Sequence, residues 1–526
     1  MKILTTDQVR EIEGQAVKAG VSLETLMENA GRAVAAEVKQ VLSGAIGKRV
    51  LVLVGPGNNG GDGLVAARYL HNWGARVVIC LCAPRTKEDK NFNLALKCGI
   101  PVIPAYEGGS PAELDASLSS VDVIIDALFG IGKVRPIEGV FREVLEKVSG
   151  VRERRPRPLV VAVDLPSGLN SDTGEVDPSC LYADITVTLG YPKMGLFRFP
   201  GAGRVGRLVI ADIGIPPSLA QDIEVALITG EWVRETLPRR PLNAHKGSFG
   251  KVLVVAGSIN YIGAAYLACL GAARVGAGLV TLATARSLQP ILASKLTEVT
   301  YIPLPEAEPG VISSEAASTL APHAGEYDVL LLGCGLGQHP QTVEFVKSLL
   351  LGSPKLAISS LVLDADAVNI LAKVPRWWRK LERDAILTPH PGEMARLVGI
   401  SVKEVEQDRL STAQRSAKEW GKTVVLKGAN TVVAAPDGET KINNAAHPAL
   451  ASAGTGDVLS GAIAGLAAQG LSPLQAAACG VYLHSRAGEA VSRELGNAGV
   501  IATDLLPVLP RVIKALKGGG LNVTGY

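Results

Sequence analysis

The chain has 526 residues, which is too long for one hydrophobic core, so we expect two or three domains. Hydrophobic residues make up 47% and charged residues 20% of the sequence, as in soluble globular proteins, and the formal net charge of +3 gives no indication of a nucleic-acid partner. The 7 cysteines lack paired spacing, which argues against a disulfide framework and indicates buried thiols in a reducing cytoplasm.

Two segments of the sequence argue against export or membrane insertion. The opening residues MKILTTDQVREIEG contain no apolar region typical of a signal peptide, and Thr5 to Gln8 predict the capped start of a helix. Residues 459–482 are apolar but are interrupted by Gly, Gln, Ser and Pro. This pattern favours a buried pair of helices over a membrane span, so we expect no membrane partner.

The first part of the chain alternates apolar runs with helical stretches. Because the runs are nearly continuous in Val, Ile and Leu, they predict parallel strands in a sheet that is covered on both faces. We therefore expect an N-terminal Rossmann-like three-layer domain over residues 1–218. Its predicted strands are Arg49–Val54, Arg76–Leu81, Val121–Asp126, Leu159–Val163, Asp184–Leu189 and Arg207–Ile210.

The stretch GPGNNGGDG, residues 55–63, lies between a predicted strand and a predicted helix. Its glycines fit the G-x-G-x-x-G pattern of dinucleotide-binding loops. Two features argue against a dehydrogenase. Asp62 places a carboxylate where a phosphate would bind, and the second strand is followed by Arg85 instead of the acidic residue that would hold the ribose.

Polar residues follow three predicted strands of the first domain. In open parallel sheets, ligands bind beyond the carboxyl ends of the strands. Asn59, Asp126 and Ser167 offer amide, carboxylate and hydroxyl oxygens that suit a hard cation, and Asp164 remains free for proton transfer. The alternative is a structural role, because the same residue types cap turns and helix starts.

Residues 219–249 are rich in Pro, Arg and Gly and predict a linker that leads into a second domain. A second alternating series begins at Lys251 and predicts a C-terminal α/β domain over residues 250–526. Its motifs differ from those of the first series, so we infer no duplication. Its predicted strands are Lys251–Ala256, Leu279–Leu282, Asp328–Leu332, Leu361–Asp364, Ala385–Leu387, Thr423–Leu426 and Thr431–Ala434.

The stretch ASAGTGDVLSGAIAGL, residues 451–466, is the main candidate motif of the second domain. Gly454, Thr455 and Gly456 leave backbone amides open at the expected start of a helix, where they can hold anionic oxygens. Asp457 could take the proton of a hydroxyl group while these amides stabilise a transferring phosphoryl group. The structural alternative is an aspartate that the helix dipole favours in the first turn.

The motifs GPGNNGGDGL, DALFGIG, VDLPSGLN and TLGYPKMGL, with MENAG at residues 27–31, together resemble the YjeF N-terminal domain, the epimerase of the hydrated nicotinamide nucleotide NAD(P)HX. The resemblance implies Asp164 as the acid/base and potassium bound by Asn59, Asp126 and Ser167. Lys193 lies in the PKMGL segment. The resemblance also implies a substrate site of Asn58, Asn59, Gly60, Gly61, Asp62, Gly130, Ile131, Gly132, Lys133, Val134, Arg135, Pro136 and Asp164.

The GTGD motif, late in an α/β domain, resembles the ribokinase-like superfamily. TPHPGE at residues 388–393 has His390 where small-molecule kinases of this superfamily usually carry Asn, and it retains Glu393. With HKGSFGKVLVVAGS and LKGANTVV, it resembles the YjeF C-terminal domain, the ADP- or ATP-dependent NAD(P)HX dehydratase, over residues 225–515. The family more usually has Pro at the position of Cys334. The resemblance implies that the adenine nucleotide is held by Lys427, Gly428, Ala429, Asn430, Thr431 and Gly456, and the hydrated substrate by Ala264, Gly337, His390 and Asp457.

These resemblances imply a bifunctional repair enzyme, an isomerase and a lyase, that interconverts R and S forms of NAD(P)HX and dehydrates the S form. Asp457 would deprotonate the ring hydroxyl during phosphoryl transfer from ADP or ATP, and loss of phosphate would restore NAD(P)H. Mg²⁺ would neutralise the phosphates, with Glu393 nearby. We expect a cytoplasmic homo-oligomer that acts on NADHX and NADPHX. Two alternatives are a ribokinase-type small-molecule kinase with a fused regulatory nucleotide-binding domain and a non-catalytic nucleotide sensor.

Overall fold

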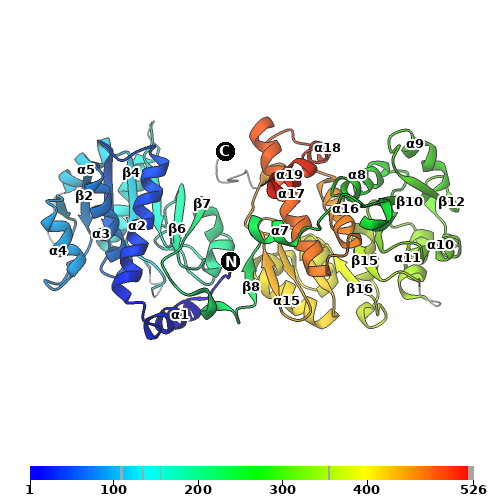
Figure 1. Ribbon diagram of the computed structural model, residues 1–526, viewed down its shortest axis with the longest axis horizontal. Helices are drawn as coiled ribbons and strands as arrows, with labels where there is room; N and C mark the ends of the chain where they lie inside the picture. Colours follow the sequence, from blue (N-terminus) through cyan, green and yellow to red (C-terminus); the bar gives the residue numbers. More distant parts are fainter. Residues whose placement is uncertain (107–110, 133–135, 154–155, 353–355, 519–526) are drawn as a thin grey trace. The chain divides into compact units, whose positions relative to one another are not determined.

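The computed structural model describes residues 1–106, 111–132, 136–153, 156–352 and 356–518. The chain divides into two units, Met1–Ile223 and Glu224–Tyr526. Each unit has its own sheet with helices packed around it (Figure 1). The expectation of an α/β fold with parallel sheets is therefore confirmed.

A parallel sheet forms the centre of the first unit. Its strands are β1 (Arg49–Val54), β2 (Arg76–Leu81), β3 (Val102–Pro104), β4 (Val123–Ala127), β5 (Leu159–Val163), β6 (Ile185–Leu189) and β7 (Arg207–Ala211). They follow the order β3-β2-β1-β4-β5-β6-β7. The chain therefore builds outward from β1 in one direction and then from β4 in the other. Ligands bind at such reversal points in open α/β sheets.

Helices cover both faces of this sheet because consecutive strand residues point to opposite sides. The helices are α1 (Thr6–Lys18), α2 (Leu23–Val41), α3 (Asn58–Asn72), α4 (Lys90–Lys97), α5 (Pro111–Ser120) and α6 (Gly139–Val151). Val50 and Val52 of β1 pack in a buried cluster with residues of α1, α2 and α3. Leu51 and Leu53 pack in a second cluster with residues of α5 and α6.

The first two helices begin and pack as their sequences suggest. Thr5 caps α1, because its hydroxyl accepts the N–H of Gln8 and its own N–H donates to the Gln8 side chain. Gly31, the last residue of MENAG, lets α2 approach α3: a Cβ placed on it would lie 2.4 Å from Cβ of Val65. This contact fixes the helix that follows the GPGNNGGDG loop.

The second unit is built on a larger sheet. Its strands are β8 (Val225–Leu227), β9 (Lys251–Val255), β10 (Leu279–Ala285), β11 (Thr300–Leu304), β14 (Val329–Leu332), β15 (Ser360–Leu363), β16 (Asp384–Leu387), β17 (Thr423–Leu426), β18 (Val432–Ala434) and β19 (Thr440–Ile442). They follow the order β11-β10-β9-β14-β15-β16-β17-β18-β19-β8. Only the pairs β17–β18 and β18–β19 among these described strands are antiparallel. A small hairpin of β12 (Glu306–Glu308) and β13 (Val311–Ile312) stands apart.

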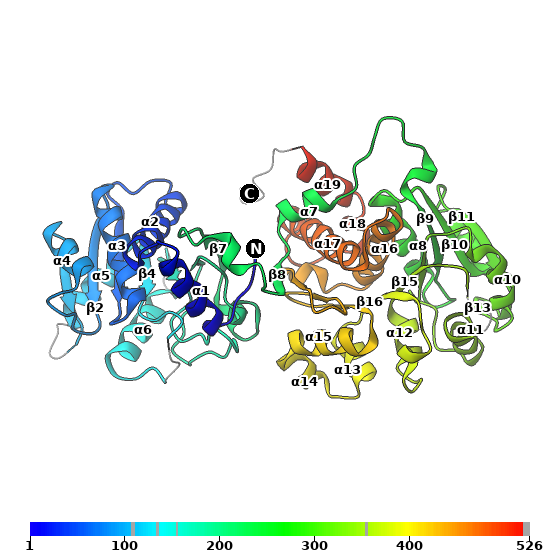
Figure 2. The ribbon, with the colours of Figure 1, turned by 60° about the horizontal axis from the view of Figure 1, so that its bottom comes forward.

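The helices of the second unit surround this sheet (Figures 1 and 2). They are α7 (Gly230–Thr236), α8 (Ile262–Arg274), α9 (Gln289–Ala293), α10 (Ala316–Ala324), α11 (Pro340–Leu351), α12 (Ala365–Leu371), α13 (Pro391–Val398), α14 (Val402–Gln407), α15 (Arg409–Trp420), α16 (Thr455–Ala468), α17 (Pro473–Leu495), α18 (Ala502–Leu505) and α19 (Leu509–Lys517). Residues 219–249, the expected linker, contain β8, which extends the sheet beside β19, and α7, which packs on α17 and α19.

Helices α8 and α16 pack unusually closely because glycines face backbone at the contact. A Cβ placed on Gly271 of α8 would lie 2.5 Å from the carbonyl oxygen of Val458, and one on Gly461 of α16 would lie 2.1 Å from that of Ala268. Helices α16 and α17 also pack on each other. The apolar segment near residues 459–482 therefore forms buried helices, as its small residues predict.

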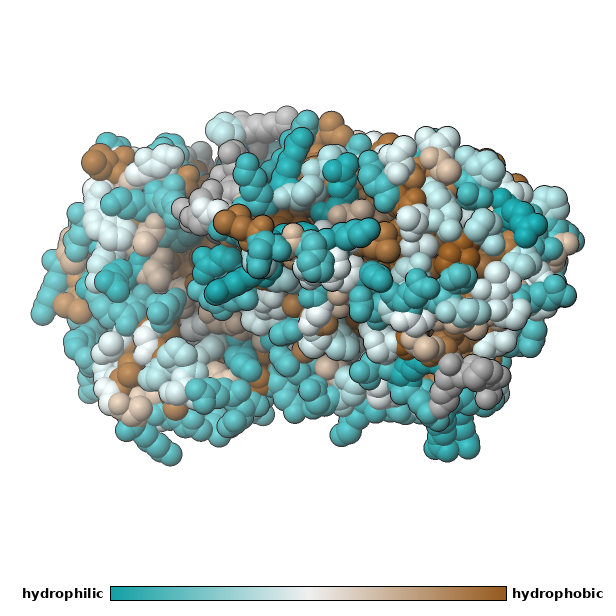
Figure 3. Space-filling view, turned by 45° about the vertical axis from the view of Figure 1, so that its right-hand side comes forward, coloured by the Kyte–Doolittle hydropathy of each residue, from teal (hydrophilic) through white to brown (hydrophobic). Residues whose placement is uncertain are grey.

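Hydrophobic side chains lie mainly inside the two units. The face drawn in Figure 3 shows hydrophobic residues interspersed among hydrophilic ones. Within the described part of the chain, no helix is both long enough and apolar enough to cross a membrane. All 7 cysteines, each in a described segment, are free thiols, and every one except the half-buried Cys98 is buried.

Candidate active sites

The carboxyl ends of β1, β4 and β5 bring the predicted polar residues of the first unit together. These strands are neighbours in the sheet. The GPGNNGGDG loop leaves β1 and enters α3, Asp126 is near the end of β4, and Asp164 and Ser167 follow β5. All three segments therefore meet at one edge, on either side of the point where the strand order reverses.

The glycines of the loop differ in what surrounds them. A Cβ placed on Gly55 would lie 1.9 Å from the carbonyl oxygen of Leu128, and one on Gly60 would lie 2.2 Å from that of Gly55. Gly61 is also buried, against Met27. Gly57, by contrast, faces open space. Most of these glycines therefore serve close packing, while Gly57 and the exposed Asn58 leave the start of α3 accessible.

We expect Gly60→Ala to destabilise the first unit by about 1–3 kcal/mol, because the added methyl group would overlap a backbone carbonyl in a tight loop. Calorimetry should show a lower unfolding temperature for this unit and an unchanged one for the second. Gly57→Ala is the matched control, since its φ of −91° suits any residue and its Cβ would meet no atom within 4 Å. Equal unfolding temperatures for both variants would contradict this assignment.

Arg85, which follows β2, binds the GPGNNGGDG loop. Its guanidinium donates to the carbonyl oxygens of Gly55 at 2.9 Å and Gly57 at 3.0 Å. It also pairs with Asp89 at 2.7 Å. At the position where a dehydrogenase would carry an acidic ribose ligand, this chain therefore carries a cation that ties down its own backbone.

Asp126 and Ser167 form a fully buried pair. The Ser167 hydroxyl donates to Asp126 Oδ1 at 2.6 Å, and the Ser167 N–H donates to Oδ2 at 2.9 Å. Burial raises the pKa of Asp126. The buried Asn59 amide contacts Gly130, and its nitrogen has no hydrogen-bond partner among the described residues. The oxygens of these three side chains are the type of ligand that a hard cation takes, whereas the Asn59 nitrogen is a donor and would not bind one.

Asp164 is paired with a buried lysine. Lys193 Nζ donates to Asp164 Oδ1 and also to the Leu189 carbonyl oxygen at 3.0 Å. The Leu189 N–H donates to the same Oδ1 at 3.0 Å. Asp164 is 6% exposed and Lys193 1% exposed. Within the described residues all hydrogen bonds to this carboxylate fall on Oδ1, so Oδ2 is the oxygen available to a substrate.

Asp62 and Glu13 share the electrostatic surroundings of this pair. Burial, reinforced by the charges of Asp164 and Glu13, raises the pKa of Asp62 well above its usual value. Burial also raises the pKa of Glu13, against the opposing effect of Lys193. Because a higher pKa favours the uncharged carboxyl group, these surroundings weaken the repulsion between Asp62 and a phosphate that the sequence suggests.

The second predicted substrate segment, Gly130 to Pro136, is only partly described. Gly130 lies against Asn59, and Gly132 faces open space. Ile131 packs at the margin of the core, and Pro136 is exposed. Lys133, Val134 and Arg135 lie outside the described residues. The described part therefore brings this turn beside the candidate cation ligands.

In the second unit, Asp457 lies in the first turn of α16. Gly454 precedes the helix in the left-handed conformation, with φ of +87°. The ligand atoms of Asp457, Asp364 and Cys334 all lie within 4.8 Å of one another. Burial, together with the charge of Asp364, raises the pKa of Asp457 to about 7. A carboxylate with this pKa is matched to accepting a proton near neutral pH.

Because this pKa is about 7, we expect the catalytic rate at this site to depend on pH. If deprotonated Asp457 acts as the base, kcat/KM should fall about tenfold for each unit of pH below that value. The measurement is a pH profile with saturating nucleotide, with the activity of the first unit in the same buffers as the control. A rate that stays constant well below neutral pH would contradict the role of Asp457.

Lys427 lies between two carboxylates at the start of α16. Its Nζ is 2.7 Å from Asp364 Oδ1 and 4.0 Å from Glu393 Oε2, and it lies 3.5 Å from a Cβ placed on Gly456. Burial alone would lower the pKa of Lys427, but the carboxylates of Asp364 and Glu393 raise it. A charged ammonium therefore stands beside the open amides of GTGD.

His390 caps α13 next to this lysine. Its Nδ1 accepts the N–H of Gly392 at 3.0 Å, and its own N–H donates to Glu393 Oε2 at 2.8 Å. Burial, with the charge of Lys427, lowers the pKa of His390, so the imidazole is neutral. Nδ1 is used within the helix cap, and Nε2 lies 3.5 Å from Glu393 Oε1 on a side chain that is half exposed.

The other predicted substrate residues lie around a glycine turn. A Cβ placed on Gly335 would lie 2.7 Å from Cβ of Ala264, and the Ser258 hydroxyl donates to the Gly335 carbonyl oxygen at 2.7 Å. The Gly337 N–H donates to Asp366 Oδ2 at 2.8 Å. Ala264 therefore packs against the turn that carries Cys334, Gly335 and Gly337.

Residues Gly428 to Thr431 form the turn between β17 and β18. Gly428 and Asn430 have positive φ, and the Thr431 hydroxyl donates to the Gly428 carbonyl oxygen at 2.8 Å. Ala429 lies between them, half-buried. This places the predicted nucleotide-binding residues directly after Lys427.

The structure adds Glu13, Asp364 and Lys193 to the predicted sets. Asp364 was predicted only as a strand end, yet it also accepts hydrogen bonds from Thr388 at 2.8 Å and Ser460 at 2.7 Å. A carboxylate at the end of a parallel strand is the signal that could have identified it. Glu13 carries no comparable signal, since a helical Glu is usually an exposed residue.

Two families match consecutive parts of the chain. A family described as NAD(P)H-hydrate dehydratase matches residues 252–511, and the YjeF-related protein N-terminus matches residues 23–195. The bifunctional NAD(P)H-hydrate repair enzyme Nnr of Moorella thermoacetica is 43% identical over 94% of this chain and 92% of the relative. The Nnr of Thermofilum pendens is 38% identical over 98% of this chain and 97% of the relative.

Among solved structures, the ADP/ATP-dependent NAD(P)H-hydrate dehydratase of Bacillus subtilis, co-crystallised with ATP and Mg²⁺, is 34% identical. It covers 56% of this chain and 99% of its own, with a TM-score of 0.48. The two full-length relatives instead cover both units of this chain. The chain therefore belongs to the family of bifunctional NAD(P)H-hydrate repair enzymes.

Proposed function

We propose that this protein epimerises R and S forms of NAD(P)HX in its first domain, residues 1–218, and dehydrates the S form in its second, residues 250–526. The observation that carries the proposal is that one chain holds two separate buried carboxylate sites, Asp164 with Lys193 and Asp457 with Asp364. Each lies at the carboxyl edge of its own parallel sheet. With both activities on one chain, the epimerase converts the R form into the S form, so that a dehydratase specific for S can repair both epimers.

In the first site, Asp164 is the acid/base. Epimerisation at the hydrated carbon needs reversible ring opening or loss and return of water, and either route moves one proton. Lys193 holds Oδ1, which orients Oδ2 toward that proton. The start of α3 binds the phosphates of the substrate. Asn59, Asp126 and Ser167 would hold K⁺, which supplies a fixed positive charge beside the substrate loops.

In the second site, Asp457 deprotonates the ring hydroxyl as its oxygen attacks the terminal phosphoryl group of ADP or ATP. The shortened nucleotide leaves, and a phosphate ester replaces the hydroxyl. The ring nitrogen then expels inorganic phosphate, and loss of a proton from the neighbouring carbon restores the double bond of NAD(P)H. Lys427 and the GTGD amides stabilise the transferring group, with Glu393 supporting the Mg²⁺ that enters with the nucleotide.

The direct test is to incubate the protein with mixed NADHX or NADPHX epimers, Mg²⁺ and either ADP or ATP, and to follow the absorbance of the reduced nicotinamide. Complete recovery is expected, with one free phosphate released for each molecule repaired. Recovery of one epimer alone would exclude the epimerase, and no recovery would exclude both activities. A stable phosphorylated product would instead support the small-molecule kinase.

Potassium should stabilise the first unit as well as activate it. We expect KCl to raise the unfolding temperature of this unit above its value in choline chloride at equal ionic strength, and Asp126→Asn to abolish the difference. Thermal unfolding measures this without reference to activity. An identical response of wild type and Asp126→Asn would contradict the cation site. The proposal also includes a homo-oligomer in the cytoplasm without nucleic-acid or membrane partners.

A further inference from the structure

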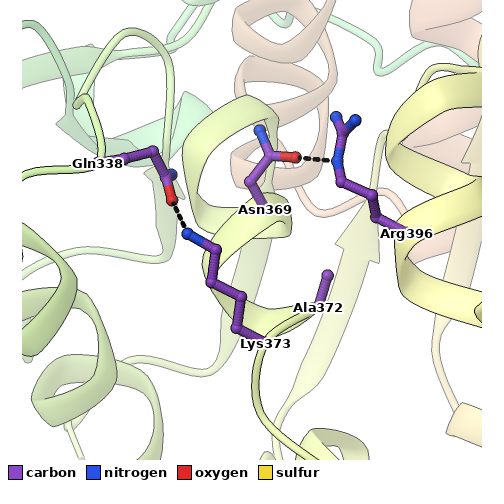
Figure 4. Close-up of a pocket in the computed structure, with 5 residues that line it drawn as sticks. All are labelled: Gln338, Asn369, Ala372, Lys373 and Arg396. Atoms are coloured by element: carbon purple, nitrogen blue, oxygen red, sulfur yellow. Dashed lines mark hydrogen bonds between the residues drawn. The ribbon is translucent and has the colours of Figure 1, made fainter.

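A basic cavity of about 390 Å³ lies in the second unit, within the range of small-molecule pockets, about 300–1,000 Å³. Its lining residues belong to the end of α12, to α13 and to the segment after β14. Helices α12 and α13 contact each other and lie side by side in Figure 2. Figure 4 shows its lining residues, with two cationic side chains among amides: Gln338, Asn369, Ala372, Lys373 and Arg396.

Two of the lining residues lie near predicted substrate residues in the fold. Gln338 directly follows Gly337, and both bind the same carboxylate: Gln338 Nε2 donates to Asp366 Oδ1 at 3.0 Å and the Gly337 N–H donates to Oδ2 at 2.8 Å. Arg396 lies on α13, the helix that His390 caps. After burial and the charge of Lys427, the charge of Arg396 also lowers the pKa of His390. One wall thus adjoins Gly337 and another adjoins His390.

Both cations of the cavity are exposed side chains held by amides. Lys373 Nζ donates to Gln338 Oε1 at 2.8 Å, and Arg396 Nε donates to Asn369 Oδ1 at 2.9 Å (Figure 4). Among the residues that the structure describes, these amides are the hydrogen-bond partners of the two cations, and the charge of Arg396 also acts on the buried Glu393, where it opposes the rise in pKa. The amides orient the two cations without cancelling their charge. The terminal guanidinium nitrogens of Arg396 remain available for two parallel bonds to an oxyanion.

We propose that this cavity binds a phosphate group of the hydrated dinucleotide substrate, with Arg396 and Lys373 as its ligands. The phosphates of the adenine nucleotide are assigned to a different cluster, in which Lys427 lies between Gly456 and Asp364. The dinucleotide carries a bridging diphosphate, and in NADPHX it also carries a 2′-phosphate. With either phosphate group bound in the cavity, the rest of the substrate would extend along His390 toward the other predicted substrate residues. This inference rests on the proposed dehydratase function.

The test compares Arg396→Gln, Lys373→Gln and the double variant with wild type, using S-NADHX and S-NADPHX separately at saturating nucleotide. Each single change should raise KM by roughly tenfold, the effect of losing one charged hydrogen bond, and should leave kcat and the KM for ADP or ATP near wild type. Arg396→Lys should recover part of the loss because it keeps the charge without the forked geometry. Lys295→Gln, which removes an exposed lysine beyond α9, is the control.

A rise in KM for NADPHX alone would support the proposal and assign the cavity to the 2′-phosphate. An equal rise in KM for both substrates would support it and assign the cavity to the bridging diphosphate. No rise in KM beyond that of Lys295→Gln, or a rise in the KM for the nucleotide alone, would overturn it. If the wild-type protein itself failed to dehydrate either substrate, the proposed function would fail, and that result is distinct from these.

Discussion

Asp457→Asn is expected to slow nucleotide-dependent dehydration by roughly 10²–10⁴-fold, the range that a general base contributes. Asn keeps the size of the side chain and is tolerated in the first turn of a helix, so α16 should retain its conformation. What is lost is the acceptor for the hydroxyl proton, at a carboxylate whose pKa is about 7. The measurement is recovery of reduced nicotinamide from the S epimer with Mg²⁺ and ADP or ATP.

Two controls accompany this variant. Interconversion of the epimers, followed by chromatography on the same preparation, should remain near the wild-type rate because it depends on the first unit. Asp437→Asn removes an exposed carboxylate from the turn between β18 and β19 and should leave both activities unchanged. If dehydration survived in Asp457→Asn, the base would have to be another group, and Asp364 would be the next residue to test.

Asp164→Asn is expected to reduce epimerisation by a similar factor, roughly 10²–10⁴-fold, while dehydration of the pure S epimer continues. Asn is well suited to the left-handed backbone at this position, where φ is +65°. The substitution also leaves the buried Lys193 ammonium without its counter-charge. Removing one partner of a buried pair costs about 3–5 kcal/mol, so the first unit should also unfold at a lower temperature.

A second substitution separates catalysis from stability. In the double variant Asp164→Asn/Lys193→Met the buried charge is removed with its partner, so most of the lost stability should return. Epimerisation should remain absent, because no acid/base is restored. Recovery of both properties would show that Asp164 is a structural ion-pair partner, and recovery of neither would point to a backbone effect. Calorimetry and the epimer assay together distinguish these results.

The long central strands were predictable because a parallel strand buried on both faces is a continuous apolar run. Strands β1, β2, β5 and β17 have the bounds that the sequence predicts. Strands β3, β8 and β19, of 3 residues each, were not predicted, whereas the equally short β18 was, because its Val-Val pair follows the LKGAN turn. Strand β11 contains Pro303, which argues against a central strand and is compatible with its position at the sheet edge.

The sites were predictable where a motif marks the end of a strand. Asp126, Asp164 and Ser167 could be placed at one edge because their strands are parallel, and Asp457 could be placed in a helix start by its glycines. Side-chain pairing could not be predicted, since it depends on tertiary contacts. The partner of Asp164 follows 29 residues later in sequence and that of Lys427 lies 63 residues earlier. The raised pKa of Asp62 likewise depends on burial and on the charges of Asp164 and Glu13, which only the fold brings close.

The glycine contact between α8 and α16 has a mechanical consequence for catalysis. Ala264 lies on α8 and Asp457 lies on α16. At Gly271 and Gly461 the backbones of these two helices are in direct contact. Because no side chain lies between the helices at these two positions, a change of rotamer there cannot alter their spacing. The relative position of Ala264 and Asp457, two predicted substrate residues, therefore depends on a contact between backbones.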